Sequence, residues 1–221
     1  PERDLLLEPR LFGMWLGNGE SRGNFDLCGI DHELAEDWKN AGYTITSIKR
    51  KNSSNPEFRV WKVKGLRSIL KEIGVLQTTT EKGSQKRIPD EYLFSSEWQR
   101  RELLSGLLDT DGSVSSDGRC EFYSSNQLLA KQVHILVSSL GYKATLRSKR
   151  AVYDGKDYGE TYTVAFQGRG DEFGLARKKA TFDAARRSKG RQADRGDLRY
   201  IVDVRPVDSV PVRCIRVANE S

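Results

Sequence analysis

The chain has 221 residues, which fits one large domain or two small halves and is long enough to bury well over half of its surface. Hydrophobic residues make up 37%, and no stretch approaches the roughly 20 apolar residues of a membrane helix, which excludes a transmembrane protein. Three distant cysteines exclude a disulfide framework and indicate a reduced, cytoplasmic protein, and with only two histidines a zinc site is also excluded. A net charge of +6 gives modest support for a polyanionic partner.

The first half of the chain is predicted to alternate helices with strands. Its first helix covers Leu5–Gly17 and carries apolar residues nearly all round, which predicts a buried helix. The elements after it are a turn-rich segment at Ser21–Asn24, a strand at Phe25–Ile30, a helix at His32–Ala41, strands at Thr44–Lys51 and Phe58–Lys64, and a helix at Leu66–Gly74.

The second half repeats this order. Leu11–Gly19 (LFGMWLGNG) aligns with Leu104–Gly112 (LSGLLDTDG). The elements of the second copy are a helix at Arg101–Asp109, a turn at Ser115–Gly118, a strand at Arg119–Ser124, a helix at Gln127–Leu140, strands at Lys143–Val152 and Thr161–Gln167, and a helix at Glu172–Arg187. Gly42 and Gly141 supply the C-terminal stops of corresponding helices. We therefore expect an α+β fold with two pseudo-symmetric αββαββα halves.

The repeat also sets the expected domain limits. The first half is expected at residues 1–84, a connector at 85–97, the second half at 98–190, and a linker with a tail at 191–221. Ser95-Ser96-Glu97 favours an N-cap at the start of the second motif helix. In the tail, Arg199–Pro206 and Val210–Val217 are strand-like and have no counterpart in the repeat.

The two motif helices are expected to pack against each other at a pseudo-twofold axis. Small residues allow two helix backbones to approach closely. In the first helix these are Gly13 and Gly17, and in the second they are Ser105 and Gly106. The C-terminal ends of the two helices would then lie side by side.

A polar residue followed by glycine ends each motif helix, Asn18-Gly19 in the first copy and Asp111-Gly112 in the second. An acid at a helix C-terminus faces the negative end of the helix dipole, which costs up to about 1 kcal/mol unless a cation compensates. This position therefore indicates a bound metal ion. The alternative is an ordinary helix-stopping turn, but its recurrence at the same place in a repeat favours the metal.

These motifs resemble the LAGLIDADG motif of homing endonucleases. Leu104–Gly112 looks like that motif, Leu11–Gly19 looks like its first copy, and the repeat resembles the αββαββα half of the family. Lys86–Pro89 leading into the second motif helix resembles the intein-encoded branch, and the segment from Val210 onward resembles the strands before an intein's C-terminal splice junction. The resemblance covers about residues 5–190 as endonuclease and 198–221 as a splicing-domain remnant.

The resemblance implies a metal-dependent, site-specific endonuclease that cuts both strands of a long double-stranded DNA target across the minor groove. It implies Mg²⁺ or Mn²⁺ as the cofactor, with Ca²⁺ as a non-catalytic substitute, and a monomer in a bacterial or phage host. The implied metal site contains Asp111, Asn18, Gly17 and Thr110. The implied catalytic residues are Asp111, Asn18, Lys86 in the first half, and Lys178 or Lys179 in the second.

This chain departs from the family at Asn18, where the family has an acid. A neutral amide attracts a hard cation less than a carboxylate does, so metal binding on that side is weakened. The chain is then either a natural inactive variant or one changed deliberately, and nicking of one strand is the most activity expected. The alternative function is a non-cleaving DNA-binding protein or a maturase of the same fold. Protein splicing itself is not expected, because Pro1 and Ser221 are not splicing residues.

Base recognition is expected from the two antiparallel, saddle-shaped sheets, whose outward strand faces would follow the major groove. Unspecific phosphate contact by the same side chains is an equal alternative. The candidate DNA-binding residues are Arg22, Lys49, Lys51, Arg59, Lys62, Arg119, Lys143, Thr145, Arg147, Lys149, Thr163 and Gln167.

Several other residues are expected to be structural. Asp109, two residues before Asp111, is interpreted as an interfacial or capping carboxylate. The tryptophans Trp38, Trp61 and Trp98 are expected in the core or at an interface, and Cys28 and Cys120 are expected to be small buried hydrophobes.

Overall fold

The computed structural model describes residues 1–20, 26–49, 55–76, 86–189 and 201–213 of the chain. The elements before the second motif helix are α1 (Pro9–Asn18), β1 (Leu27–Gly29), α2 (His32–Asn40), β2 (Ile45–Lys49), β3 (Arg59–Val63), α3 (Leu66–Glu72) and α4 (Asp90–Leu93). The elements from there on are α5 (Glu97–Asp111), β4 (Gly112–Val114), β5 (Arg119–Ser124), α6 (Gln127–Ser139), β6 (Thr145–Tyr153), β7 (Lys156–Gln167) and α7 (Ala176–Lys189).

Two antiparallel sheets confirm the α+β class. One sheet has the order β1-β3-β2 and the other has the order β4-β5-β7-β6. The described part of the first sheet has three strands rather than the expected four, but a single bridge between Gly19 and Leu27 lies where β4 pairs with β5 in the second sheet. The segment 21–25 between these two bridge residues lies outside the described part of the chain.

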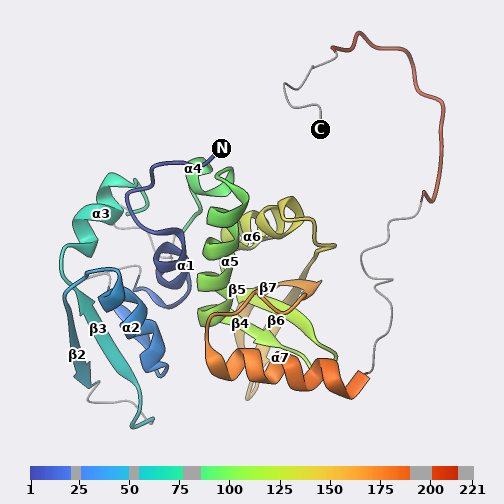
Figure 1. Cartoon of the computed structure of the whole chain (residues 1–221). Coiled ribbons are helices and arrows are strands. Elements are labelled where there is room, and N and C mark those ends of the chain that lie inside the picture. The colour runs from blue at the N-terminus through green and yellow to red at the C-terminus, as the bar shows by residue number, and fades with distance from the viewer. Residues whose placement is uncertain (21–25, 50–54, 77–85, 190–200, 214–221) are drawn as a thin grey trace.

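The motif helices α1 and α5 stand side by side at the centre of the molecule, with one sheet on each side (Figure 1). Glycine makes this close approach possible. A Cβ on Gly13 would lie 2.4 Å from the carbonyl oxygen of Leu103, and one on Gly106 would lie 2.1 Å from that of Arg10. Both glycines therefore face the backbone of the opposite helix, and the predicted helix pairing through small residues is confirmed.

Local signals explain where several elements begin and end. The Ser96 hydroxyl and the Gln99 side chain form a capping box at the start of α5, as predicted for this segment. Gly42 and Gly141 follow α2 and α6 with φ of 90° and 84°, a left-handed conformation that glycine adopts without strain. The first motif helix starts at Pro9 rather than Leu5, because proline fits the first turn of a helix and ends any helix before it.

The connector between the halves is part of the core. Ile88 and Tyr92 are buried, and the Tyr92 ring lies 4.4 Å from that of Phe12, centroid to centroid. The Tyr92 hydroxyl donates to the Leu7 carbonyl at 2.9 Å and accepts from the Leu7 amide at 3.2 Å. This segment therefore ties the N-terminus to α5, and it places Lys86 next to both motif helices.

Some predictions were wrong in detail. Trp98 is 61% exposed in the first turn of α5, whereas Trp38 and Trp61 are buried as expected. Cys120 is buried, but Cys28 is only half-buried. Of the tail segments predicted as strands, Arg199–Pro206 and Val210–Val217, residues 201–206 and 210–213 form no strand and are exposed, away from the folded body (Figure 1), and the remaining residues lie outside the described ranges. A strand needs a partner for its backbone groups, and no described strand lies against this segment.

Candidate active site at the ends of the motif helices

The C-terminal ends of α1 and α5 lie against each other, as the repeat predicted. A Cβ on Gly17 would lie 1.9 Å from Oγ1 of Thr110 and 3.4 Å from Cγ of Asp111. The Thr110 hydroxyl bonds back to the Gly106 and Leu107 carbonyls, both at 3.0 Å, so it stays on α5. Glycine at position 17 thus lets the end of α1 lie directly beside Asp111.

Asp111 borders an open cavity of about 530 Å³ at this helix junction. Among the described residues, no hydrogen bond or ion pair engages its carboxylate. Burial raises the pKa of Asp111, while the nearby ammonium groups of Lys86 and Lys178 lower it in part. The site therefore holds a desolvated carboxylate that a cation would stabilise. The cavity is lined by Leu16, Gly17, Lys86, Asp111, Tyr123, Ser124, Ser125, Asn126, Leu129, Lys149, Ala151 and Thr161.

Asn18 occupies the corresponding place at the end of α1 but does not line this cavity. A Cβ on Gly29 would lie 3.2 Å from Nδ2 of Asn18, so the Asn18 amide lies over β1. The two motif ends therefore differ in charge and in surroundings.

Lys86 reaches the end of α1 from the connector. Its Nζ donates to the Gly17 carbonyl at 2.9 Å and lies 5.4 Å from the centre of the Trp15 ring. Burial lowers the pKa of Lys86 to about 8, and the carboxylate of Asp111 opposes this shift. A cation at a helix C-terminus is stabilised by the helix dipole. The structure thus brings Lys86, Gly17 and Asp111 together on one cavity.

Lys178 reaches the end of α5 from the first turn of α7. Its Nζ donates to the carbonyls of Leu108, Asp109 and Gly112 at 2.6, 2.8 and 2.7 Å, and the Thr110 carbonyl lies at 3.5 Å. An ammonium has three N–H groups, so main-chain oxygens occupy all of them. Burial, followed by the Arg177 charge, lowers the pKa of Lys178 to about 8. Lys179, by contrast, is exposed.

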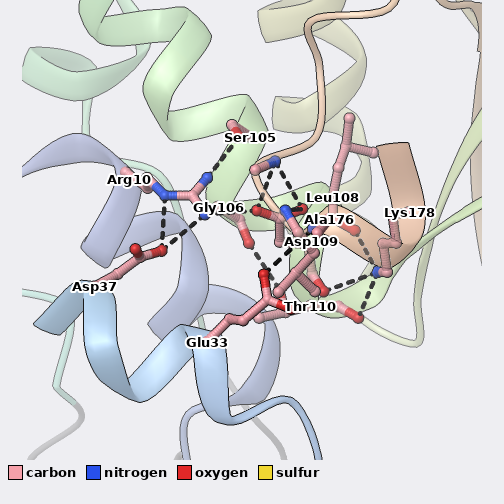
Figure 2. A network of polar contacts seen from close by, with 12 residues as sticks. Arg10, Glu33, Asp37, Ser105, Gly106, Leu108, Asp109, Thr110, Ala176 and Lys178 are labelled. Atoms are coloured by element: carbon pink, nitrogen blue, oxygen red, sulfur yellow. Dashed lines mark hydrogen bonds and ion pairs between the residues drawn. The ribbon is translucent and has the colours of Figure 1, made fainter. Parts of the chain in front are cut away.

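Asp109 does not line the cavity, and its buried side chain belongs to a polar network between the two halves (Figure 2). Its carboxylate accepts from the amides of Gly174, at 2.9 and 3.0 Å, and Leu175, at 3.1 Å, and it pairs with Arg10 at 2.7 Å. Arg10 also bonds Asp37 and Ser105. The expected interfacial carboxylate at position 109 therefore agrees with the structure.

The residues present fit one hard cation better than two. Among the described residues there is no group of three or more His, Cys, Asp or Glu side chains that could hold a metal. The oxygen donors at the junction are the Asp111 carboxylate and the carbonyls of Gly17 and Thr110, and the Gly17 carbonyl already accepts from Lys86, while the predicted ligand Asn18 has its amide over β1. The unpartnered, desolvated carboxylate of Asp111 fits a divalent ion such as Mg²⁺, whereas a ligand set centred on Asn18 has no charge to offer.

The candidate DNA-binding side chains lie on several strands. Those exposed in the structure are Lys49, Lys62, Lys143, Thr145, Arg147, Lys149 and Gln167, and those half-buried are Arg59, Arg119 and Thr163. Some have protein partners: Arg59 donates to the Pro56 carbonyl at 2.6 Å, Arg119 pairs with Asp117 at 2.8 Å, and Gln167 donates to the Gly118 carbonyl at 3.0 Å. Arg22 and Lys51 lie outside the described residues. Lys149 also borders the Asp111 cavity.

Sequence analysis missed the residues that hold the two lysine-bearing segments. The Asn126 amide donates to the Lys86 carbonyl at 2.7 Å, and Gln132 exchanges hydrogen bonds with Ile88, so α6 fixes the connector. Arg177 pairs with Asp31 at 2.5 and 2.6 Å, so α7 is fixed to the first half. Asn126 is a recognisable N-cap of α6, but the long-range partners left no signal in the sequence.

No helix in the described ranges is long and apolar enough to cross a membrane.

Two kinds of relative were found by comparing the chain with known proteins. A replicative DNA helicase DnaB from Mycobacterium intracellulare is 38% identical over all 221 residues, and the chain spans 34% of that protein's length. Structures of the homing endonuclease I-DmoI are similar to this chain. Mesophilic variants of I-DmoI give a TM-score of 0.46 at 12% identity, covering 80% of this chain and 93% of theirs. The I-DmoI complex with DNA and Ca gives a TM-score of 0.49 at 11% identity, covering 80% of this chain and 96% of the I-DmoI chain.

A protein family also matches the second half of the chain. Residues 98–166 match the LAGLIDADG-like domain, and this range contains the motif helix α5, its Asp111 terminus and most of the second sheet. The match begins at the second residue of α5 and ends one residue before the end of β7. Residues 98–166 are therefore a LAGLIDADG-like domain, as the second motif predicted.

Proposed function

We propose that this chain is a site-specific, metal-dependent DNA endonuclease encoded within an intein, and that Asn18 impairs it. One observation carries the proposal: the ends of both motif helices meet at one cavity, where a desolvated carboxylate and a buried ammonium lie together. Perturbed acid and base groups in a cavity are typical of a reaction site. The match of residues 98–166 to the LAGLIDADG-like domain supports hydrolysis of a phosphodiester bond as the reaction.

In this proposal Asp111 would hold one divalent ion, with the main-chain carbonyls of Gly17 and Thr110 as neighbouring oxygen donors, whereas the Asn18 amide lies over β1 and is not among them. The ion, when bound, activates water and offsets charge on the phosphate. Lys86 lies on the same cavity, and its ammonium stabilises the negative charge that develops on the phosphate. The pKa of Lys86, lowered by burial to about 8, keeps the protonated form predominant at pH 7. Lys178 holds the end of α5 through main-chain carbonyls, and Lys179 is left to contact solvent or DNA.

Double-stranded DNA is the proposed partner, bound by a monomer that contains both halves. The exposed cationic side chains of β6, Arg147 and Lys149, and of β2 and β3, Lys49 and Lys62, supply charge on both sides of the cavity. Several phosphate contacts would make the affinity fall steeply with salt, by roughly a thousandfold between 50 and 200 mM. Contacts spread over two sheets support a long target sequence.

The intein context rests on the helicase relative. All 221 residues match a protein named as a replicative DNA helicase, yet they span only a third of its length and include a LAGLIDADG-like domain. An endonuclease segment inserted in a helicase gene accounts for both facts. Residues 1–84 and 98–190 would then be the two endonuclease halves, 85–97 the connector, and 191–221 a linker and splicing-domain remnant.

A non-cleaving DNA-binding protein of the same fold is the second candidate, and Asn18 is the observation that favours it. The amide removes one of two carboxylates, and it lies over β1 rather than on the Asp111 cavity. This candidate predicts the same DNA affinity without any strand cleavage.

A plasmid assay separates the two candidates. The plasmid carries the helicase gene sequence without the insertion, and supercoiled, nicked and linear products are scored with Mg²⁺ and with chelator. We expect at most nicking from the Asn18 chain and linear product from Asn18→Asp, because the added carboxylate attracts a second ion. The double variant Asn18→Asp/Asp111→Asn is the control, because it again has only one carboxylate at the two helix ends. No cleavage by Asn18→Asp of a plasmid that it binds would reject the nuclease and retain the binder.

A further inference from the structure

The network around Asp109 links the first half of the molecule to the reaction centre of the second half. Asp109 lies two residues before Asp111 in α5, and its side chain has no exposed surface. It makes three contacts with the amides of Gly174 and Leu175, the residues that lead into α7. A buried carboxylate needs such partners, because burial without compensation is costly.

Arg10 supplies the opposing charge from the other half. It lies in the first turn of α1, and its guanidinium contacts Asp109 at 2.7 Å, Asp37 at 2.8 Å and Ser105 at 2.6 Å. Figure 2 shows this guanidinium between Asp37 of α2 and the α5 side chains. Burial lowers the pKa of Arg10, but the Asp109 and Asp37 carboxylates outweigh it, so the net pKa is raised. Arg10 therefore stays charged at all relevant pH values.

Position 174 is shaped to receive this guanidinium. A Cβ on Gly174 would lie 2.1 Å from Nη2 of Arg10 and 2.4 Å from its Cζ. Only glycine leaves room for Arg10 to lie against the backbone here. The Arg10–Asp109 pair and the 174–175 backbone are thus packed as one unit.

The same segment delivers Lys178, which holds the end of α5. Lys178 lies three residues after Leu175, and its ammonium binds carbonyls on both sides of Asp111, at Leu108 and Asp109 before it and at Gly112 after it. Lys178 therefore fixes the backbone on both sides of Asp111. The 174–175 segment positions Lys178, and Asp109 and Arg10 hold that segment in place.

We propose that Arg10 and Asp109 are positioning residues through which the first half fixes Asp111 in the second half. Neither contacts the cavity, so they act through the segment 174–178 and not on substrate. The expected effect on cleavage rests on the proposed nuclease function, whereas the contacts that fix the end of α5 do not depend on it. Loss of the pair would slow the strand cleavage that relies on Asp111 more than the cleavage that relies on position 18.

The test compares the two strands of one duplex. In the Asn18→Asp background, each strand of the target is end-labelled, and single-turnover rates are measured for Arg10→Met, Asp109→Asn and Gly174→Ala. The strand whose cleavage Asp111→Asn slows most is the strand cut with the help of Asp111. We expect each variant to lower the cleavage rate of that strand by about tenfold or more and that of the other strand by no more than about threefold, since small misplacement of a reacting group has large effects. DNA affinity should stay within about threefold, because no DNA-facing residue changes.

Asp37→Asn is the matched control, because it removes another partner of the same guanidinium without touching the 174–175 segment. Amide hydrogen exchange gives a readout without metal or DNA: the Gly174 and Leu175 amides should exchange faster in Arg10→Met and Asp109→Asn than in Asp37→Asn. Equal slowing of both strands, or unchanged exchange at 174–175, would overturn the proposal. If Asn18→Asp cuts neither strand of DNA that it binds, the nuclease function fails, and the exchange data still decide the positioning role.

Discussion

The two halves of this molecule share a backbone plan but not a reaction centre. Both motif helices end beside the same cavity, and a buried lysine contacts the C-terminus of each. At α5 the terminal residue is Asp111, and Lys178 gives all its N–H groups to main-chain carbonyls. At α1 the terminal residue is Asn18, and Lys86 borders the cavity. The two halves therefore share the packing of their motif helices but differ in the charge at the helix ends.

The helix interface is where the halves should behave alike. Gly13→Ala and Gly106→Ala should each lower the free energy of unfolding by about 3 kcal/mol, because the added Cβ meets main-chain atoms that cannot move aside. Chemical denaturation measures the change. Ser68→Ala, on an exposed face of α3, is the control for adding a helical alanine. A loss below 1 kcal/mol in either variant would show that the two helices can separate without cost.

Lys86 should matter for rate rather than for binding. In the Asn18→Asp background, Lys86→Ala should lower the cleavage rate by about a hundredfold, as the loss of a charge-stabilising donor does, while DNA affinity stays within several-fold. Single-turnover cleavage and equilibrium binding give the two quantities. Arg87→Ala is the neighbouring control, since Arg87 is exposed and donates to the Gly74 carbonyl, away from the cavity. Equal losses of rate and affinity would make Lys86 a DNA-positioning contact.

Lys178 should matter for stability instead. Lys178→Met should cost about 2 kcal/mol of unfolding free energy, because it leaves the carbonyls of Leu108, Asp109 and Gly112 without their donor. The exposed Lys179→Met is the matched control and should change stability by less than about 0.5 kcal/mol. Thermal or urea unfolding distinguishes them. A fully stable Lys178→Met variant would remove the assigned capping role and return Lys178 to the catalytic candidates.

The smallest effect is expected at the Asp31–Arg177 pair, which fixes α7 to the first half. The hydrogen bonds from Arg177 lower the pKa of Asp31 against the opposing effect of burial. Because the pKa of Asp31 is lower in the folded state, the pair stabilises the fold at any pH above the ordinary Asp pKa. This stabilisation is lost as the pH falls through the folded-state pKa. Asp31→Asn should therefore cost about 0.5–1 kcal/mol at pH 7, because Arg177 is half-exposed.

Urea unfolding of both forms from pH 7 to pH 2 measures this difference. The two curves should converge as the pH falls below the ordinary Asp pKa and through the lowered folded-state pKa of Asp31. A difference that stays constant with pH would mean that packing, and not the ion pair, holds α7 to α2.

The sequence by itself determined the repeat and most of its elements, because these depend on local patterns. The strand at Arg119–Ser124, the caps and the glycine stops all follow from neighbours in the chain. The helix pairing also followed, since small residues at helical spacing allow close approach whatever surrounds them. The strand prediction for the tail was wrong because a strand depends on a partner elsewhere in the fold. Ile201 and Val202 have a high strand propensity, but both are largely exposed and form no strand.

Only the tertiary structure decided which side chains meet. The sequence predicted equivalent roles for Lys86 and for either Lys178 or Lys179, but it contains no sign that Lys178 would bind three carbonyls or that Lys86 would share a cavity with Asp111. Arg10 and Asp109 lie 99 positions apart, so no local pattern joins them. Ion pairs and caps between distant segments depend on the exact position of each backbone after the core has packed, and composition or periodicity does not encode that position.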